Sequence, residues 1–361
     1  PTGQASANNN DSIRLSLLTC APGEEIYSLF GHTAIRYENS SQGIDVVFNY
    51  GLFSFNTPNF IFRFSLGETD YQLGATDYER FAAEYAFFGR SVWQQTLNLT
   101  DEEKTELIRL LQENYRPENR VYRYNFFYDN CATRPRDKIE ESIAGKVIYP
   151  AEPQDGSLTF RDIVHQYCKG HPWARFGIDL CIGSEADQPI TQRQMMFAPF
   201  YLMDAFDGAQ IKGDSIQRPL ITANELIVDA TPEPDESDWM PTPLQCSLLL
   251  FILTAAATIY GIRRRTGLWG IDLFLFGIAG IVGCVLAFLA LFSQHPAVSS
   301  NFLLLVFHPG QLLFLPYIIY CVRKGKKCWY LTLNLAVLTL FIVLFPVIPQ
   351  RFDFAVVPLA L

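Results

Sequence analysis

The stretch Tyr124–Asp137, YNFFYDNCATRPRD, decides where the chemistry of this chain lies and how the neighbouring elements are arranged. A run of aromatic residues ends at Asp129 and Asn130, a single cysteine follows, and the sequence then turns basic. Asp129 or Asn130 can cap a helix by accepting a backbone N–H bond, which places Cys131 in the first turn. There the helix dipole and unpaired N–H groups favour an anion, so we expect a lowered pKa for the Cys131 thiol. The alternative is a small buried cysteine at a strand-to-helix corner.

The composition divides the chain near Pro243. The first 243 residues carry 20 Lys and Arg against 35 Asp and Glu, whereas the rest carries 8 against 2 and is almost entirely apolar. The acidic balance of the first part argues against nucleic acid as a partner. We therefore predict an acidic globular head over residues 1–230, an acidic proline-rich linker over 231–243 and a membrane domain over 244–361.

Four apolar segments after the linker each approach the roughly 20 residues that a bilayer requires. Basic residues cluster in the loops after the first and third segments, and the loop Ser293–Asn301 has none. The positive-inside rule makes the basic loops cytoplasmic and places the N-terminal domain and the C-terminal tail outside. Pro309 and Pro316 predict a kinked third segment whose freed carbonyl groups need partners. The segments are about 244–260, 269–292, 302–322 and 328–347.

The head has the pattern of an α+β domain with an antiparallel sheet. Its polar opening, PTGQASANNNDS, is typical of a mature chain from which a targeting segment has been removed. The runs that alternate as strands do are 12–20, 31–37 and 45–51. A short turn at 40–43 joins the last two runs, which predicts an antiparallel hairpin.

Two helices of the head have clear start signals, and one aromatic stretch is harder to assign. A helix is expected over 77–88, and another begins at Thr100, with Glu103 at the capping-box position. The stretch 53–66, FSFNTPNFIFRFSL, is interpreted as core in preference to a lid or a surface that touches lipid.

His32 opens the second predicted strand and is the candidate base. The alternation of GHTAIR places His32, Ala34 and Arg36 on one face of that strand. A cysteine at a helix start that faces a histidine on a strand is the arrangement of thiol catalysis. A third group must orient the imidazole, for which Asn49 is the first choice and Asp45 the second. The alternative for His32 is a hydrogen-bonded core histidine.

The remaining cysteines of the head are weaker candidates. Cys20 is the rival nucleophile, although a packed small residue suits its place at a strand end. Cys168 and Cys181 enclose a short loop, and in an oxidising compartment they either pair or stay free. His165 and His171 flank Cys168 without a fourth ligand, so we expect no metal and no cofactor.

Four segments taken together resemble a known family: LLTCAPGEEIYSLFGHTAIR, FNYGLF, YNFFYDNCATRPRD and HPAVSSN. The order of an early His and a later Cys looks like the circularly permuted branch of the NlpC-type papain-like superfamily, which includes the lecithin:retinol acyltransferases. More closely, the segments resemble the Bacteroidetes family of Lnb-type lipoprotein N-acyltransferases, from about Leu15 to the last membrane segment. The chain departs from that pattern at His308-Pro309, where the family has Asn-Pro.

The resemblance implies a permuted papain-like periplasmic domain followed by an all-α domain of four transmembrane helices in the inner membrane. It implies Cys131 as nucleophile, His32 as base and Asn49 as orienting residue. An acyl chain would pass from a phospholipid to Cys131 as a thioester, and then to the α-amine of a diacylglyceryl-cysteine lipoprotein.

Further residues of the chain are candidates for substrate binding. Arg134 and Arg136 suit a lipid phosphate because a guanidinium group binds phosphate with two N–H groups, and ordinary salt bridges are the alternative. The aromatic residues near 53–64 are candidates for the lining of an acyl channel. The complete set of substrate-binding candidates is Asn130, Arg134, Arg136 and His295.

Two other function classes stay open. A membrane-tethered peptidoglycan amidase would use the same cysteine and histidine with water or an amine as acceptor. Acyl label on a protein thiol favours transfer, whereas cleavage of muropeptides by the head favours the amidase. A non-catalytic scaffold that binds a membrane partner would have a Cys131 no more reactive than free cysteine.

Overall fold

The structure, a computed structural model, describes residues 12–56, 58–150, 158–213, 217–230 and 239–361. Contacts divide the chain into two units, each described by itself below. The sheet unit comprises residues 1–158 and 189–235, and the helical unit comprises 159–188 and 236–361. The polar opening up to residue 11 and most of the predicted linker lie outside the described residues.

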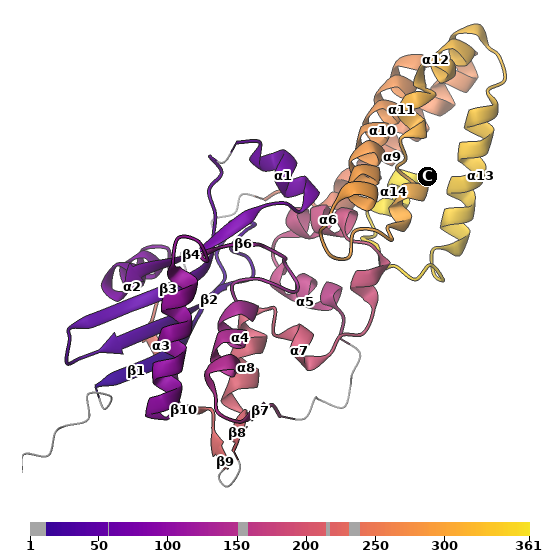
Figure 1. Cartoon of the computed structure of the whole chain (residues 1–361). Coiled ribbons are helices and arrows are strands. Elements are labelled where there is room, and N and C mark those ends of the chain that lie inside the picture. Colours follow the sequence, from indigo (N-terminus) through magenta and orange to yellow (C-terminus); the bar gives the residue numbers. More distant parts are fainter. Residues whose placement is uncertain (1–11, 57, 151–157, 214–216, 231–238) are drawn as a thin grey trace, which may run out of the picture. The chain divides into compact units, whose positions relative to one another are not determined.

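Seven antiparallel strands form the main sheet of the sheet unit, in the order β10-β5-β1-β2-β3-β4-β6 (Figure 1). The predicted hairpin is confirmed, since β2 and β3 pair and place Ala34 opposite Asn49. The register between β1 and β2 places Cys20 opposite His32. The strands are β1 Ile13–Cys20, β2 His32–Asn39, β3 Ile44–Leu52, β4 Asp70–Asp77, β5 Val92–Leu97, β6 Val121–Arg123 and β10 Ile221–Val228.

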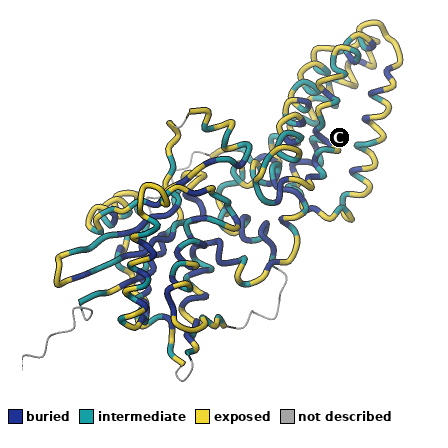
Figure 2. The backbone as a smooth tube through the Cα atoms, viewed as in Figure 1, coloured by how far each residue is buried: buried dark blue, intermediate teal, exposed yellow. Residues whose placement is uncertain are grey.

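Different helices cover the two faces of this sheet. Leu17 and Ile35 point into the main core with residues of α3, α4 and α8, whereas Leu18 and Ala34 pack with Phe81 of α2. Figure 2 shows the buried residues concentrated along the sheet and the helices against it. A small second sheet contains β7 Lys146–Ile148, β8 Gln210–Lys212 and β9 Gln217–Pro219. The helices are α1 Phe60–Leu66, α2 Tyr78–Phe87, α3 Asp101–Tyr115, α4 Thr133–Ser142, α7 Gln192–Met195 and α8 Pro199–Asp207.

Helix α3 begins as its sequence predicts. The Thr100 side chain accepts the backbone N–H of Glu103, and the Glu103 carboxylate accepts the backbone N–H of Thr100. Glu103 is itself buried, and its carboxylate also forms an ion pair with Arg218. The cap therefore joins the start of α3 to the segment that contains β9.

Apart from Phe53, which packs against the main core, the aromatic stretch after β3 is not core, so that prediction is wrong for α1. Helix α1 buries none of its residues, and Ile61 and Phe62 are 80% and 58% exposed. The helix is apolar around most of its circumference but packs on one side only, so the remaining apolar side chains stay at the surface. We call the residues in mutual ring contact here the α1 aromatic cluster: Tyr27, Phe53, Phe55, Phe60 and Phe64.

Two helices of the helical unit, α9 Pro243–Arg264 and α10 Trp269–Phe292, are long and apolar enough to cross a membrane. Only 11% and 22% of their apolar windows are buried, as expected of helices that face lipid. The third predicted segment is broken into η2 Phe302–Leu305, α11 Gly310–Leu313 and α12 Leu315–Lys324, with a bend of 72°. The shorter apolar helix α13 Trp329–Leu344 and the final α14 Val356–Ala360 follow.

Polar side chains satisfy the break in the third segment. The Gln311 side chain donates to the carbonyl oxygen of Val306 at 2.8 Å, which supplies one of the partners that a kink requires. His308 Nε2 lies 3.2 Å from Asn334 Oδ1 of α13. The residue that departs from the family pattern therefore joins the broken segment to the following helix.

A buried ion network ties the segment 159–188 to the rest of the helical unit. Arg161 is fully buried and donates to Asp179 at 2.6 Å and Asp187 at 2.8 Å. Arg351, beyond α13, donates to the same Asp187 at 2.9 Å. The network links α5 Phe160–Tyr167, α6 Pro172–Cys181 and η1 Ser184–Asp187 to the C-terminal tail.

The HPAVSSN loop after α10 docks on the same segment. The Gly183 N–H donates to the Ala297 carbonyl oxygen at 2.7 Å, and the Asn301 side chain donates to the Leu180 carbonyl oxygen at 2.7 Å. The loop thereby satisfies the last carbonyl groups of α6. This gives the motif a structural role inside the helical unit.

Arg161→Ala leaves two buried carboxylates without their main partner, which costs about 3–5 kcal/mol. We expect the unfolding midpoint of the detergent-solubilised protein to fall by about 10 °C. Arg175→Ala is the matched control, because it removes a single contact made by a guanidinium group that is 44% exposed. Equal midpoints for Arg161→Ala and wild type would contradict the structural role of the network.

Candidate active site

Asn130 sets the start of α4 and with it the position of Cys131. Its Oδ1 accepts the backbone N–H groups of Ala132 and Thr133 at 2.8 and 2.9 Å, as a capping side chain would. The N-cap position of α4 is nevertheless Ala132, so Cys131 lies in the turn just before the helix and not, as predicted, in its first turn. Its Nδ2 donates to two further backbone carbonyl oxygens at 2.8 and 2.9 Å. These four bonds use the hydrogen-bonding capacity of the amide. Asn130 therefore positions Cys131 and has no polar group left for the substrate role that the sequence suggested.

The Cys131 thiol lies at the start of β2, next to the candidate base. The backbone N–H of Thr33 forms a hydrogen bond to the sulfur, and Thr33 directly follows His32. The predicted nucleophile and the predicted base thus come together although 98 residues separate them in sequence.

The imidazole of His32 is oriented by Asn49. His32 Nε2 lies 3.2 Å from Asn49 Oδ1, and Asn49 Nδ2 donates to the Val47 carbonyl oxygen at 3.3 Å. Because the second bond directs Oδ1 at the ring and an amide oxygen only accepts, Nε2 carries the proton in neutral His32. Nδ1 is then the unprotonated nitrogen that can take a proton from the thiol.

Two glycines make this close arrangement possible. Gly31 has φ +77°, and a Cβ there would lie 2.6 Å from the Cys20 carbonyl oxygen. Gly51 has φ +89°, and a Cβ there would lie 3.4 Å from Cys131 Cβ. A residue with a side chain would be strained at both positions, so glycine allows β3 to pass beside the nucleophile.

The two candidate groups, Cys131 and His32, are both neutral near pH 7. Burial raises the pKa of Cys131 to about 11, although the Thr33 N–H and the Cys131 N–H both act to lower it. Burial lowers the pKa of His32 to about 4, and the nearby charge of Arg90 lowers it further. The expected lowering of the Cys131 pKa is therefore wrong. Desolvation of the thiolate outweighs a helix start whose next two N–H groups are already bound to Asn130.

The two arginines predicted to bind phosphate have internal partners. Arg134 donates to both carboxylate oxygens of Asp129 at 2.6 and 2.8 Å, and its guanidinium carbon lies 3.5 Å from the centre of the Tyr122 ring. Arg136 is 5% exposed and donates to Asp137 and to a backbone carbonyl oxygen. In this geometry the salt bridge, which the sequence left open as the alternative, is the observed state of both guanidinium groups.

Tyr122 is a site residue that the sequence did not indicate. Its hydroxyl is buried and has no hydrogen-bond partner among the described residues. A Cβ placed on Gly51 would lie 3.9 Å from the Tyr122 hydroxyl oxygen and 3.4 Å from Cys131 Cβ. The hydroxyl and Cys131 therefore lie close to the same point on β3. A buried hydroxyl without a partner costs free energy, and this one is free to bond to a group that enters the site. No local signal marks Tyr122, because one aromatic residue on a strand is ordinary.

Other predicted residues take no part in this centre, although Cys20 is the strand partner of His32. Cys20 is fully buried, and burial raises its pKa to about 12. Asp45, the second choice as orienting residue, accepts two hydrogen bonds from Arg36 at 2.9 and 2.7 Å. His295 belongs to the loop after α10 in the helical unit, so no geometry relates it to Cys131.

Comparison with known families covers both parts of the chain. Residues 4–165 match the Lnb N-terminal periplasmic domain, and residues 235–361 match the Lnb transmembrane domain. The chain belongs to the Lnb family. No curated protein and no solved structure matches it.

As a member of the Lnb family, the chain is an α+β membrane protein with a periplasmic N-terminal domain. The orientation inferred from the basic loops agrees with this assignment. Cys168 and Cys181 are both free thiols in the structure. Within the described residues, no group of three or more His, Cys, Asp or Glu side chains could hold a metal ion.

The pKa of His32 leads to a prediction for acid stability. Because the folded pKa is about 4 against 6.5 in the unfolded chain, the unfolded state binds more protons below pH 6.5. Stability is thus lost as the pH falls from 6.5 to 4, by about 3 kcal/mol at most from this group. Unfolding midpoints of His32→Gln, measured at pH 7 and 4.5, should differ less than those of wild type. If the two midpoints differed as much in His32→Gln as in wild type, the assignment would be contradicted. It would also be contradicted if the control His171→Gln reduced this difference as much as His32→Gln does.

Proposed function

We propose that this Lnb protein is a lipoprotein N-acyltransferase that uses a phospholipid as acyl donor and Cys131 as nucleophile. The acceptor is the α-amine of a diacylglyceryl-cysteine at a lipoprotein N-terminus. Support comes from three features of the chain: the Cys131, His32 and Asn49 arrangement, the membrane-spanning helices, and the aromatic path described below.

In the first step the Cys131 sulfur attacks an ester carbonyl carbon of the phospholipid. A carbon–sulfur bond forms and the carbon–oxygen ester bond breaks. The thiol proton passes to His32 Nδ1 and then to the departing alkoxide, which leaves as lysophospholipid. Because both groups start neutral, proton transfer accompanies the attack and no stable ion pair precedes it.

In the second step the lipoprotein amine attacks the thioester carbonyl. A carbon–nitrogen bond forms, the carbon–sulfur bond breaks, and His32 carries the amine proton to the sulfur. The enzyme returns to its neutral thiol and imidazole, and the product is a triacylated lipoprotein.

Two donors are suited to the oxyanion that both steps create. The backbone N–H of Cys131 forms no hydrogen bond to another described residue. It interacts only with the sulfur of Cys131 itself. The Tyr122 hydroxyl is the second donor. Burial raises the pKa of Tyr122, with Arg134 over its ring acting against that shift, so the hydroxyl keeps the proton that it donates. Asp129 and Arg134 then act through Tyr122 as positioning residues.

The observation that favours a lipid donor is a continuous aromatic path from the surface to the nucleophile. Tyr124 lies beside Cys131, and its ring stacks on Tyr71 at 4.2 Å. Tyr71 stacks on Phe53 at 4.9 Å, and Phe53 stacks on Phe60 in the exposed α1 aromatic cluster. Such a path suits an acyl chain, whereas a polar muropeptide would gain little from it.

The thiol centre alone does not separate transfer from the amidase or scaffold alternatives. With a pKa of about 11, Cys131 would alkylate slowly near neutral pH whether it is catalytic or not. The discriminating observation is therefore a covalent acyl-enzyme formed from a lipid.

The direct test mixes the detergent-solubilised protein with phospholipid and a synthetic diacylglyceryl peptide, followed by mass spectrometry of both. We expect an acyl-sized mass gain on wild-type protein and on the peptide, and neither gain with Cys131→Ala. Asn49→Ala should slow the transfer without abolishing it, because the base loses only its orientation. Wild-type transfer by a folded Cys131→Ala variant would exclude the mechanism, and muropeptide cleavage without any acyl gain would favour the amidase.

Tyr122→Phe removes only the hydroxyl and keeps the ring under Arg134. We expect the rate of acyl-enzyme formation to fall about 100-fold with little change in the apparent donor affinity. The matched control is Tyr50→Phe, which removes a buried hydroxyl that already donates to Asn114 at 2.8 Å and should affect stability more than rate. Equal rates for Tyr122→Phe and wild type would remove Tyr122 from the oxyanion site.

A further inference from the structure

Arg90 lies beside the catalytic centre without belonging to it. Its Nε donates to the Ala21 carbonyl oxygen at 2.8 Å, one residue beyond Cys20, the strand partner of His32. Its guanidinium carbon is 4.7 Å from the centre of the Tyr85 ring. A positive charge is therefore held within electrostatic reach of His32.

This charge has no acidic partner. The sequence up to residue 243 has 35 acidic against 20 basic residues, and most described arginines of the sheet unit form ion pairs. Arg90 forms none with any described residue. A half-buried guanidinium group near a reaction centre, in so acidic a domain, has lost much of its water and gained no counter-ion. The guanidinium group of Arg90 can therefore bind an anion that enters the site.

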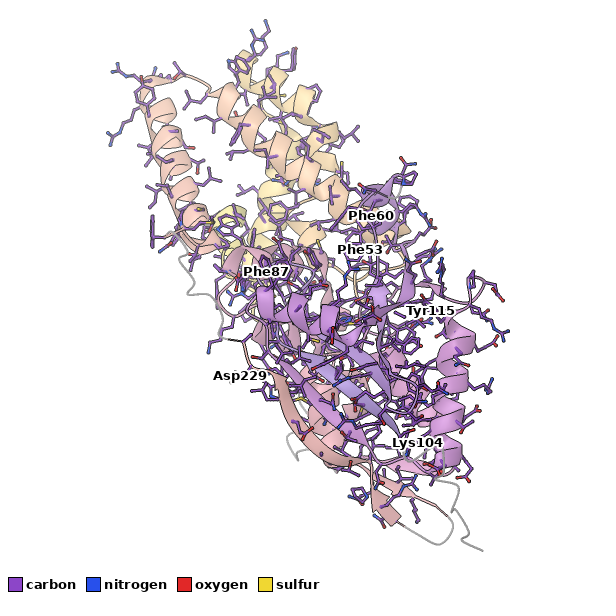
Figure 3. All side chains as sticks on the ribbon, turned by 90° about the vertical axis from the view of Figure 1, so that its left-hand side faces the viewer. Phe53, Phe60, Phe87, Lys104, Tyr115 and Asp229 are labelled. Atoms are coloured by element: carbon purple, nitrogen blue, oxygen red, sulfur yellow. The ribbon has the colours of Figure 1, made fainter. Side chains whose placement is uncertain are left out.

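The surroundings of Arg90 suit the interface of a bilayer. Phe87 and Phe88, at the end of α2, are 79% and 62% exposed and contact each other edge to face at 5.2 Å. Gly89, with φ +63°, ends the helix and turns the chain into Arg90. Figure 3 shows Phe87 toward the same end of the sheet unit as Phe53 and Phe60, whereas Lys104 lies toward the opposite end. Aromatic side chains beside a cation are typical of membrane–water interfaces.

We propose that Arg90 binds the phosphodiester anion of the acyl donor and holds it beside Cys131 and His32. This inference rests on the proposed function and names the group that recognises the donor. Arg134 and Arg136 are bound to carboxylates of the chain, whereas Arg90 has no such partner among the described residues and is available to a ligand. The Nη groups of Arg90 would donate to two phosphate oxygens, while Nε keeps its bond to Ala21.

A phosphate fits this site better than a carboxylate-bearing ligand. In a phospholipid the phosphate and the ester carbonyls are joined through one glycerol unit, so an anion bound beside the nucleophile places an ester near the sulfur. The lipoprotein acceptor carries its reacting amine and two esters but no phosphate. Arg90 would thus distinguish the first substrate from the second at a shared centre.

The kinetic test compares two donors with the same acyl chain, phosphatidylglycerol and an uncharged p-nitrophenyl ester, in neutral detergent micelles with the full chain. We expect Arg90→Gln to lower kcat/KM for phosphatidylglycerol about 10- to 100-fold, mainly through KM, and to change that for the uncharged ester less than about 3-fold. Arg90→Lys should fall between, because it keeps the charge and loses the paired donors. Equal losses with both donors, or no loss with phosphatidylglycerol, would overturn the proposal.

The matched control is Arg80→Gln, an exposed arginine of α2 that also forms no ion pair with a described residue. It should leave both donors unchanged, so a loss there would indicate a general charge effect. Unfolding midpoints of both variants show whether the Arg90 variants remain folded.

A binding measurement separates this proposal from the proposed function. Dihexanoyl phosphatidylglycerol is titrated into Cys131→Ala and into the double variant Cys131→Ala/Arg90→Gln, with inorganic phosphate as competitor. Weaker lipid binding in the double variant supports the phosphate site, whether or not wild type transfers an acyl chain. Absence of transfer by wild type would count against the proposed function but not against the phosphate site. Equal lipid binding in the two variants overturns the role of Arg90 whatever the transfer assay shows. Binding of inorganic phosphate with no binding of the lipid would indicate a free-anion site and also overturn it.

Discussion

The amide of Asn130 is the constraint on which the proposed catalytic centre depends. Its Oδ1 accepts the N–H groups of Ala132 and Thr133, at the start of α4, and its Nδ2 donates to the carbonyl oxygens of Phe126 and Phe197. The side chain is 3% exposed, so all four bonds form away from water, where losing any one would leave a polar backbone group unsatisfied. One residue thereby fixes the aromatic turn before Cys131, the helix after it and the loop before α8. The nucleophile between these elements has little freedom to move.

Local rules were enough to predict much of this arrangement from the sequence. The bonds from Asn130 to Ala132 and Thr133 and the capping box at Thr100 depend on residues within three positions of each other, and the β2–β3 hairpin depends on alternation around a short turn. The pairing of His32 with Asn49 follows once that hairpin is known. The meeting of His32 with Cys131 across 98 residues came from residue chemistry and family resemblance, because no local rule brings two distant segments together.

What the sequence did not reveal depends on partners that are distant or on solvent. The aromatic residues of α1 have the composition of a core, but whether they are buried depends on whether another element covers them, and none does so fully. The direction of the Cys131 pKa shift depends on how much water burial removes, which a single motif does not specify. The sequence likewise shows Arg134 and Arg90 as two similar cations, and only their neighbours distinguish a paired guanidinium group from an open one.

A neutral thiol beside a neutral imidazole suits an enzyme that must transfer an acyl chain without losing it to water. A standing thiolate–imidazolium pair would attract water and would react with adventitious electrophiles in the periplasm. In the proposed mechanism, attack begins only when an ester carbonyl lies at the sulfur with its oxyanion donors in place. An anion bound at Arg90 would also reduce the positive potential that disfavours protonated His32, and so make the imidazole a stronger base at that moment. Binding of the donor and activation of the base would then be one event, which ties thioester formation to the presence of a phospholipid.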